Sequence, residues 1–259
     1  KLEIIEDIPA GKIPIHPLKT GQASRIMTGG VIPDGADTII PIEDVLTSDN
    51  SVNVNEVEEI GAHIRKKGED FSVGNPILLT GQWLSAGEIA VLATVQQSFV
   101  TVYRRPRVAI ITTGDELVEI EENVENGKVV NGNTTALASF SESCGAEAIM
   151  LPIARDRPAE IQRSIEEASD ADFILSSGGV SVGDFDYVKQ VLQEMGAKTL
   201  FWRVAMKPGK PLLFCKLNST PYFGLPGNPV SSMMSFLQFV RPALYKAAGH
   251  LPNRWKLPE

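Results

Sequence analysis

Residues 172–187 read DFILSSGGVSVGDFDY, and this stretch decides the fold. The apolar run before Ser176 predicts a buried strand, and the glycine pair Gly178-Gly179 ends it. From Tyr187 on, apolar residues recur at helical spacing until Gly196 stops the pattern. A strand, a glycine-rich turn and a helix in this order are typical of an α/β protein with parallel strands.

The same alternation continues on both sides of this stretch. The predicted strands lie at 108–112, 148–153, 172–176 and near 199–205, 211–216 and 221–224, and the predicted helices lie at 134–144, from Pro158, from Tyr187 and from Pro229, the last with a kink at Pro242. Because the strands are apolar on both faces, they predict a mostly parallel sheet covered by helices on both sides. In such sheets, ligands bind beyond the carboxyl ends of the strands.

The pattern is different before Arg104-Arg105-Pro106. Short β-type runs are punctuated by Gly and Pro, and the runs 38–45 and 51–57 flank residues 48–50 as in a hairpin. Residues 1–105 therefore predict a smaller β-rich domain, either a barrel or a sandwich. The chain opens without Met and closes on 251–259, which resembles a linker, so we expect a fragment with an incomplete first domain and no C-terminal domain.

Composition excludes several classes of protein. The length of 259 residues suits about two domains, and a formal charge of −8 argues against a general nucleic-acid binder. No apolar run approaches the roughly 18 residues of a membrane span, and no secretory leader opens the chain. We therefore expect a cytoplasmic protein whose two cysteines, Cys144 and Cys215, are buried thiols. The three histidines lack the spacing of a zinc site.

Charge is distributed unevenly along the chain. From Lys198 to the end there are nine Lys and Arg and one acidic residue, whereas the first 197 residues carry a formal charge of −16. This asymmetry fits either a localised anion site or a solvated basic face that balances the acidic part.

Two Gly-containing loops follow predicted strands. Thr112–Glu116 places a glycine and two carboxylates after a strand, which is either a plain turn or a site. Ser176–Asp186 exposes backbone N–H groups directly before a helix, as an anion cradle does. Asp184 and Asp186 in this loop could cap the helix or hold Mg²⁺, and three glycines with two serines favour a function.

Two further loops lie in the basic part of the chain. Lys207–Pro211, preceded by Arg203, either presents cations to an anion or forms an ordinary hairpin. Gly224–Ser231 contains Asn228 as a natural N-cap and Pro229 at the first helical position, so it is either a bare helix start or an anion site. Together the four loops predict a site for a phosphorylated ligand with Mg²⁺. No GxGxxG or P-loop pattern is present.

These loops closely resemble those of the molybdopterin molybdenumtransferases, the family of MoeA and of the E domains of gephyrin and plant Cnx proteins. Four other motifs are similar to that family in order and spacing: Arg25–Gly29, Pro33–Asp37, Ile64–Asp70 and Thr113–Leu117. The resemblance covers nearly the whole chain.

The resemblance implies an α/β fold with a three-layer domain over residues 106–250, like that of the molybdopterin adenylyltransferases, after a β-rich domain over 1–105. It also implies Mg²⁺-dependent insertion of molybdate into adenylylated molybdopterin, with release of AMP. A homodimer is implied for the full-length protein, with Asp70 serving the neighbouring subunit, and so is contact with the adenylyltransferase. No nucleic acid and no membrane are expected as partners.

The implied catalytic residues are Glu116, Asp156, Asp186, Arg203 and Lys207, of which Glu116, Asp156 and Asp186 would hold the metal. Arg203 and Lys210 are candidates for molybdate. The residues expected to bind the molybdopterin ligand are Thr113, Gly114, Asn133, Ser177, Gly178, Gly179, Val180, Ser181, Gly183, Asp184, Pro208, Gly209, Lys210, Pro211, Gly224, Pro226, Gly227, Asn228, Pro229 and Ser231.

The sequence departs from the family pattern in two ways. We expect that these 259 residues contain neither the family's first segment nor its C-terminal barrel, and Asn131 stands where many members carry Asp. We therefore expect this fragment to bind the nucleotide end of the ligand and to insert molybdenum poorly. A molybdopterin adenylyltransferase is an alternative that residues 1–100 disfavour, and a gephyrin-like scaffold is another, for which no receptor-binding groove is evident. The motifs do not distinguish molybdenum from tungsten.

Overall fold

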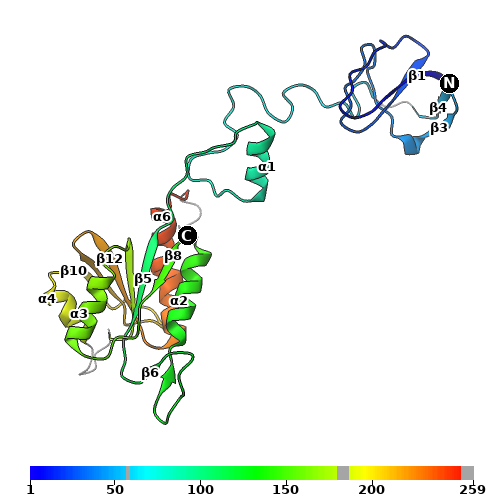
Figure 1. Cartoon of the computed structure of the whole chain (residues 1–259). Helices are drawn as coiled ribbons and strands as arrows, with labels where there is room; N and C mark the ends of the chain where they lie inside the picture. Colours follow the sequence, from blue (N-terminus) through cyan, green and yellow to red (C-terminus); the bar gives the residue numbers. More distant parts are fainter. Residues whose placement is uncertain (57–58, 180–186, 252–259) are drawn as a thin grey trace. The chain divides into compact units, whose positions relative to one another are not determined.

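The computed structural model describes residues 1–56, 59–179 and 187–251 (Figure 1). The chain forms two compact units, Lys1–Ile77 and Leu78–Glu259. The pattern of the sequence changes near residue 105, and the domain boundaries inferred from it stay a prediction.

A six-stranded sheet in the order β10-β11-β12-β9-β5-β8 forms the centre of the second unit. Its strands are β5 (Arg107–Thr112), β8 (Glu147–Met150), β9 (Phe173–Ser177), β10 (Lys198–Trp202), β11 (Leu213–Leu217) and β12 (Thr220–Leu225). The strands β12, β9, β5 and β8 pair in parallel, whereas β10, β11 and β12 pair antiparallel at one edge. The predicted α/β fold with a mostly parallel sheet is confirmed.

Helices cover both faces of this sheet, and each face has its own core. They are α2 (Gly132–Ser143), α3 (Pro158–Glu167), α4 (Tyr187–Glu194), α5 (Pro229–Ser235), the π-helix η2 (Phe236–Val240) and α6 (Arg241–Ala247). Ile111 and its neighbours pack on α3 and α4, whereas Ile110 packs on α2, η2 and α6 (Figure 1). Strand alternation thus sends successive apolar side chains into opposite layers.

Local sequence explains most of the helix ends. The side chain of Asn131 caps α2, and Pro158 opens α3. The predicted long helix from Pro229 is present, but its irregular turn is η2, which lies before Pro242 rather than at it. Pro242 lacks an N–H, so it cannot donate to the preceding turn of the helix.

A four-stranded sheet forms the first unit, in the order β2-β1-β4-β3. Its strands are β1 (Leu2–Ile8), β2 (Gln22–Ile26), β3 (Val45–Ser48) and β4 (Ser51–Val54). The predicted hairpin is confirmed for β3 and β4, with Asp49 and Asn50 between the paired residues Ser48 and Ser51.

Two predictions for residues before 105 are wrong. The segment 38–44 is not a strand: it contains the 3-10 helix η1 (Ile42–Asp44), which follows Pro41, a residue that cannot donate to a ladder. The apolar residues after 85 form the helix α1 (Ala86–Thr94), whereas residues 1–105 were predicted to form a β-rich domain. Ser85 and Glu88 form a capping box at its start, and the backbone N–H of Ser85 donates to the Glu88 carboxylate at 2.9 Å.

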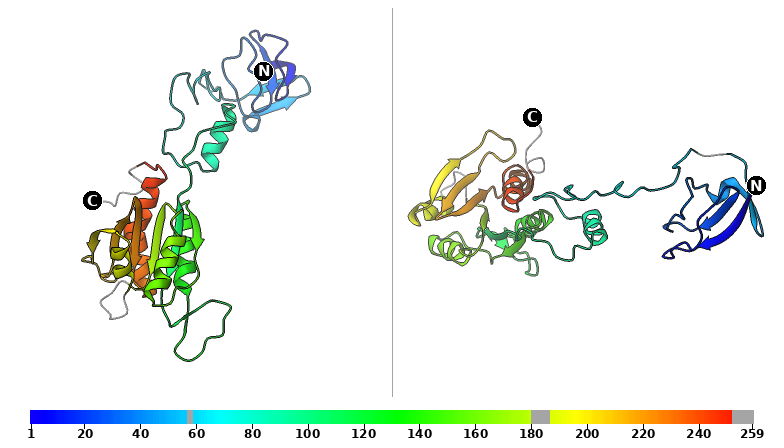
Figure 2. Two further views of the ribbon diagram at one scale, coloured as in Figure 1. Left: turned by 60° about the vertical axis from the view of Figure 1, so that its left-hand side comes forward. Right: turned by 90° about the horizontal axis from the view of Figure 1, so that it is seen from above.

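Two short strands lie outside the main sheet. β6 (Leu117–Val118) and β7 (Val129–Val130) pair in parallel, and the segment between them extends beyond the end of the sheet in the views of Figures 1 and 2.

Both cysteines are buried, as expected, and burial raises the pKa of the Cys215 thiol to about 12. No helix within the described residues is both long and apolar enough to cross a membrane.

Candidate functional site

Three strands of the main sheet end in the same row. Thr112 of β5 pairs with Ser177 of β9, and Ser177 pairs with Leu225 of β12. The backbone N–H of Thr113 donates to the Ser177 carbonyl, and that of Gly178 donates to the Leu225 carbonyl, both at 3.1 Å. The first, second and fourth predicted loops therefore start side by side.

The turn after β9 admits no side chain at two positions. Gly178 and Gly179 have φ angles of 94° and 65°. A β-carbon on Gly178 would lie 2.7 Å from the Thr113 carbonyl oxygen, and one on Gly179 would lie 2.5 Å from the Val188 side chain. Glycine is required here both by the backbone conformation and by the close approach of β5 and α4.

Asn133 ties the loops together. Its Nδ2 donates to Ser177 Oγ and to the Gly227 carbonyl, both at 2.8 Å. Ser177 Oγ in turn donates to the Pro226 carbonyl at 3.4 Å. One amide on α2 therefore fixes the loop after β9 against the loop after β12.

A buried polar network holds the start of α2 in place. Asn131 Oδ1 accepts from the backbone N–H of Thr134 at 3.3 Å, and Asn131 Nδ2 donates to Thr134 Oγ1 at 2.9 Å. Thr134 Oγ1 also bonds to Thr112 Oγ1 at the end of β5. The same cap that starts the helix therefore positions Asn133 two residues later.

The loop before α5 has the predicted shape. Asn228 caps the helix, since its Oδ1 accepts from the backbone N–H of Ser231 at 3.2 Å, and Pro229 occupies the first turn. Gly224 is buried in β12, and a β-carbon on Gly227 would lie 3.6 Å from the α-carbon of Gly178.

The third predicted loop, Lys207–Pro211, is called the basic loop below, and it packs against α5. A β-carbon on Gly209 would lie 2.9 Å from Ser235 Oγ and 3.5 Å from the Ser231 carbonyl oxygen. Lys207, Pro208 and Lys210 around it are exposed and Pro211 is half-buried. Two lysines are therefore presented to solvent on a turn held against α5.

The backbone of Arg203 lies beside the end of the basic loop, since its N–H donates to the Leu212 carbonyl at 2.8 Å and the next N–H, that of Val204, donates to the Lys210 carbonyl at 3.0 Å. Its guanidinium carbon is 4.1 Å from the ring centroid of Trp202, which packs against the core shared with α3 and α4. The basic loop instead packs on α5, which continues into the opposite layer. The guanidinium of Arg203 and the glycine of the basic loop thus contact two different layers.

Carboxylates gather beside the loop after β5. The backbone N–H of Asp115 donates to the Asp156 carboxylate at 3.2 Å, and that of Asp156 donates to the Asp115 carboxylate at 3.3 Å. Glu116 folds back on Gly114, whose missing β-carbon would lie 2.5 Å from a Glu116 carboxylate oxygen. Glu116 and Asp156, which the resemblance pairs, therefore come from two loops that bond to each other.

Two cations that sequence reasoning missed hold this loop. Arg155 Nη1 donates to the carbonyl of Leu117 at 2.9 Å, and Lys128 Nζ donates to that of Asp115 at 2.7 Å. Nothing in their local sequence indicates these roles, since both reach carbonyls remote in the chain.

Part of the predicted site lies outside the described residues: Val180, Ser181, Gly183, Asp184 and Asp186. Within the described ranges, no three His, Cys, Asp or Glu residues are grouped so that they could hold a metal ion. The metal set of Glu116, Asp156 and Asp186 stays a prediction.

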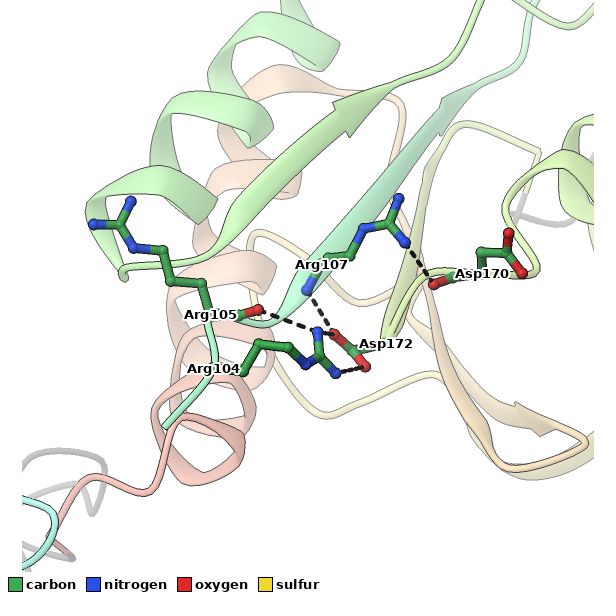
Figure 3. A network of polar contacts seen from close by, with 5 residues as sticks. All are labelled: Arg104, Arg105, Arg107, Asp170 and Asp172. Atoms are coloured by element: carbon green, nitrogen blue, oxygen red, sulfur yellow. Dashed lines mark hydrogen bonds and ion pairs between the residues drawn. The ribbon is translucent and has the colours of Figure 1, made fainter. Parts of the chain in front are cut away.

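The opposite end of the sheet carries an ionic network. Arg104 donates from both terminal nitrogens to the Asp172 carboxylate, each at 2.7 Å, and the backbone N–H of Arg107 donates to it at 2.7 Å (Figure 3). The hydrogen bonds from Arg104 lower the pKa of Asp172. This network fixes the amino ends of β5 and β9, far from the loops, and its role is structural.

Two family models match most of the chain. Residues 109–246 match the model of the probable molybdopterin binding domain, and residues 2–95 match that of the MoeA N-terminal region, domains I and II. The fold and the loops thus belong to a molybdopterin-binding class of α/β protein.

Curated relatives and a solved structure agree with these models. The chain is 42% identical to the molybdopterin molybdenumtransferase of Nostoc sp., over 98% of the chain and 59% of that protein, and 38% identical to that of Haemophilus influenzae, over 92% and 58%. The molybdopterin biosynthesis MoeA protein of Pyrococcus horikoshii superposes with a TM-score of 0.75 at 30% identity, over 97% of the chain and 62% of that structure. The chain belongs to the MoeA family of molybdopterin molybdenumtransferases, and it spans about three fifths of the length of these relatives.

Proposed function

We propose that this chain carries the ligand-binding core for insertion of molybdate into adenylylated molybdopterin, with Mg²⁺ and with release of AMP. Relatives of 38% to 42% identity bear the name molybdopterin molybdenumtransferase, and this supports the reaction class. We propose a cytoplasmic location, a homodimer and contact with an adenylyltransferase for the longer protein.

The observation that carries the proposal is the Asn133 amide, which bonds the loops after β9 and β12 to each other. It holds two glycine-containing turns, at Gly178 and Gly227, at a fixed separation beside the start of α2. Small residues at the carboxyl ends of parallel strands leave room for a phosphate group to approach the backbone. The phosphate link of the adenylylated ligand would lie here.

The basic loop would neutralise the ligand. Cleavage of a phosphoanhydride concentrates negative charge on phosphoryl oxygens, and fixed cations stabilise that charge. Lys207 and Lys210 are exposed on a turn that Gly209 seats against α5, so their positions are restricted at the backbone. We assign Lys207 to the phosphoryl oxygens.

The carboxylates beside β5 fit the requirements of Mg²⁺. That ion takes one or two protein carboxylates and completes its shell with phosphate oxygens and water. Glu116 and Asp156 come from loops joined by the mutual bonds of Asp115 and Asp156. We propose that they, with Asp186, hold the ion, which when bound would withdraw charge from the phosphoryl group.

Titration of the chain with AMP and Mg²⁺ tests the proposal. We expect Lys207→Ala to weaken AMP binding by about 10- to 150-fold, the loss of a charge-assisted contact of about 1.5–3 kcal/mol. Lys216→Ala is the matched control, because Lys216 is an exposed lysine on the neighbouring strand β11. Equal affinities for the wild type and Lys207→Ala at low salt would reject the assignment.

The metal role has its own test. Asp186→Asn should abolish the Mg²⁺-dependent release of AMP from adenylylated molybdopterin while the protein still folds, as judged by circular dichroism. Wild-type turnover in this variant would exclude Asp186 as a ligand, and loss of folding would show that the carboxylate caps the helix instead.

A further inference from the structure

Two buried hydroxyl groups, one in β9 and one in β12, have no hydrogen-bond partner in the part of the chain that the structure describes. They belong to Ser176 and Tyr222, whose side chains are both fully buried. Unpaired polar groups are rare in protein interiors, because they lose their bonds to water without a replacement. A buried phenol is ordinarily bonded through its O–H, and phenylalanine would fill the same space without one. The hydroxyl of Tyr222 therefore requires an explanation.

The pairing of β9 with β12 brings these two side chains to one face of the sheet. Tyr222 pairs with Ile174, and Gly224 pairs with Ser176. Ile174 and Tyr222 belong to the core shared with α3 and α4. Because successive side chains of a strand alternate between the two faces, Ser176 lies on the same face as Ile174. Gly224 has no side chain, so the phenol of Tyr222 can extend along β12 toward Ser176.

The two hydroxyls are neighbours, but they do not bond to each other. Burial raises the pKa of Tyr222, and the Ser176 hydroxyl partly offsets this rise, so the two groups lie close together. No hydrogen bond joins them, since neither oxygen has a partner with the required geometry. Buried hydroxyls that are close but not bonded to each other are the groups that ordered water bridges in protein interiors.

A third buried hydroxyl lies one strand further along, against the turn after β9. Thr113 Oγ1 also lacks a partner, and a β-carbon on Gly178 or Gly179 would lie 3.2 Å or 3.0 Å from it. Thr113 follows Ile111 by two residues, and Ile111 belongs to the core shared with α3 and α4, so Thr113 lies on the same face as Ser176. The unpartnered hydroxyls of β9 and β12 thus continue to the turn that carries the candidate site.

We propose that ordered water bonds the hydroxyls of Tyr222, Ser176 and Thr113, and that Tyr222 is through this water a positioning residue for the glycine turn after β9. Ser177, the residue after Ser176, bonds to Asn133 on the opposite face of the sheet. The turn is therefore held from one face by an amide and from the other by the bridged hydroxyls. The effect of Tyr222 on ligand affinity rests on the proposed function, whereas the water site does not.

Thermal melts of the whole chain separate bridged hydroxyls from unpaired ones. Tyr222→Phe removes the phenol O–H and keeps the ring. If water bridges the hydroxyls, this change leaves the Ser176 side of the bridge unsatisfied, and the melting temperature should fall. Ser176→Ala should lower it as well, and the double variant should lose less than the sum of the two, because it removes both ends of one bridge. A higher melting temperature in Tyr222→Phe would show an unpaired hydroxyl and overturn the proposal.

Calorimetric titration with AMP and Mg²⁺ tests the positioning role. Tyr222→Phe should bind AMP at least about fivefold more weakly, and the double variant with Ser176→Ala should bind no better although its melting temperature recovers. Ser141→Ala is the matched control, because it removes a buried hydroxyl that donates to the Leu137 carbonyl at 2.8 Å near the end of α2. Equal affinity in the wild type and Tyr222→Phe, or an equal loss in Ser141→Ala, would overturn the positioning role.

A crystal structure of the chain at a resolution that shows ordered water gives the direct view. We expect water within hydrogen-bond distance of both Tyr222 Oη and Ser176 Oγ, and a direct bond between the two hydroxyls without water would overturn the proposal. A wild-type chain that binds no AMP would remove the proposed function and the positioning role with it, whereas the melts and the crystal structure would still decide on the water site. AMP binding that depends on Lys207 but not on Tyr222 would leave the proposed function standing and remove the positioning role alone.

Discussion

The central strands β5, β9 and β12 of the second unit are largely buried, with a core on each face of the sheet, whereas the four-stranded sheet of the first unit leaves most of its side chains exposed or half-buried. Among the described residues before 78, the buried apolar side chains are Ile8, Pro33 and Val52. The second unit is therefore stabilised by its two side-chain cores, and the first by backbone pairing and turns. Loops that must keep a defined spacing lie on the sheet with the two cores.

The largest loss of unfolding free energy should come from a substitution that leaves a cavity in the core of the second unit. Ile174 is fully buried in β9, so Ile174→Ala should lower the free energy of unfolding by about 2–5 kcal/mol, measured by urea denaturation. Ile60→Ala is the control, because Ile60 is 85% exposed in the first unit and should be nearly neutral. Similar losses in both variants would remove the contrast between the units.

The stability of the first unit should depend on a turn more than on a side-chain core. Gly35 has a φ angle of 86°, and a β-carbon there would collide with the Leu18 carbonyl oxygen. Gly35→Ala should destabilise this unit by about 1–3 kcal/mol, seen as faster hydrogen exchange in β1 and β2. Gly11→Ala shares the positive φ, 79°, but has open space around it, so it should cost less. Equal exchange rates in the two variants would show that the collision is unimportant.

The ionic network of Arg104 should have the smallest effect of the three. Asp172→Asn removes its charged acceptor, but water screens the exposed Arg104. Because the folded pKa of Asp172 is lowered, its stabilisation is complete above the unfolded value of about 3.9 and is lost as the pH falls below it. Thermal melts from pH 7 to pH 3 should therefore converge for the wild type and Asp172→Asn at the acidic end, and a constant gap would contradict this origin.

The fold of the second unit was predictable because its strands and helices have distinct local patterns. β5 and β9 are continuous apolar runs, and Asn131, Pro158 and Asn228 mark helix starts with their own chemistry. The helix α1 was missed because its run of apolar residues is short and largely exposed. The spacing of Ser85 and Glu88 is nevertheless that of a recognisable capping box.

The candidate site was predictable in its loops but not in their connections. Each glycine-rich turn is visible locally, whereas the bonds of Asn133 reach residues 44 and 94 positions away. The contact of Lys189 with Trp202 likewise depends on how α4 packs against β10. Such contacts follow from the packing of the layers, which no local pattern of residues contains.

The most direct test of the account is the affinity of the chain for AMP in the presence of Mg²⁺, measured for the wild type and for Asn133→Ala. The substitution removes two hydrogen bonds that hold the turns at Gly178 and Gly227, so AMP should bind at least about tenfold more weakly while the melting temperature changes little. Gln162→Ala is the control, since it removes an amide that bonds Glu166 on the surface of α3. Unchanged affinity in Asn133→Ala, or an equal loss in Gln162→Ala, would contradict a ligand site formed by the loops after β9 and β12 that Asn133 joins.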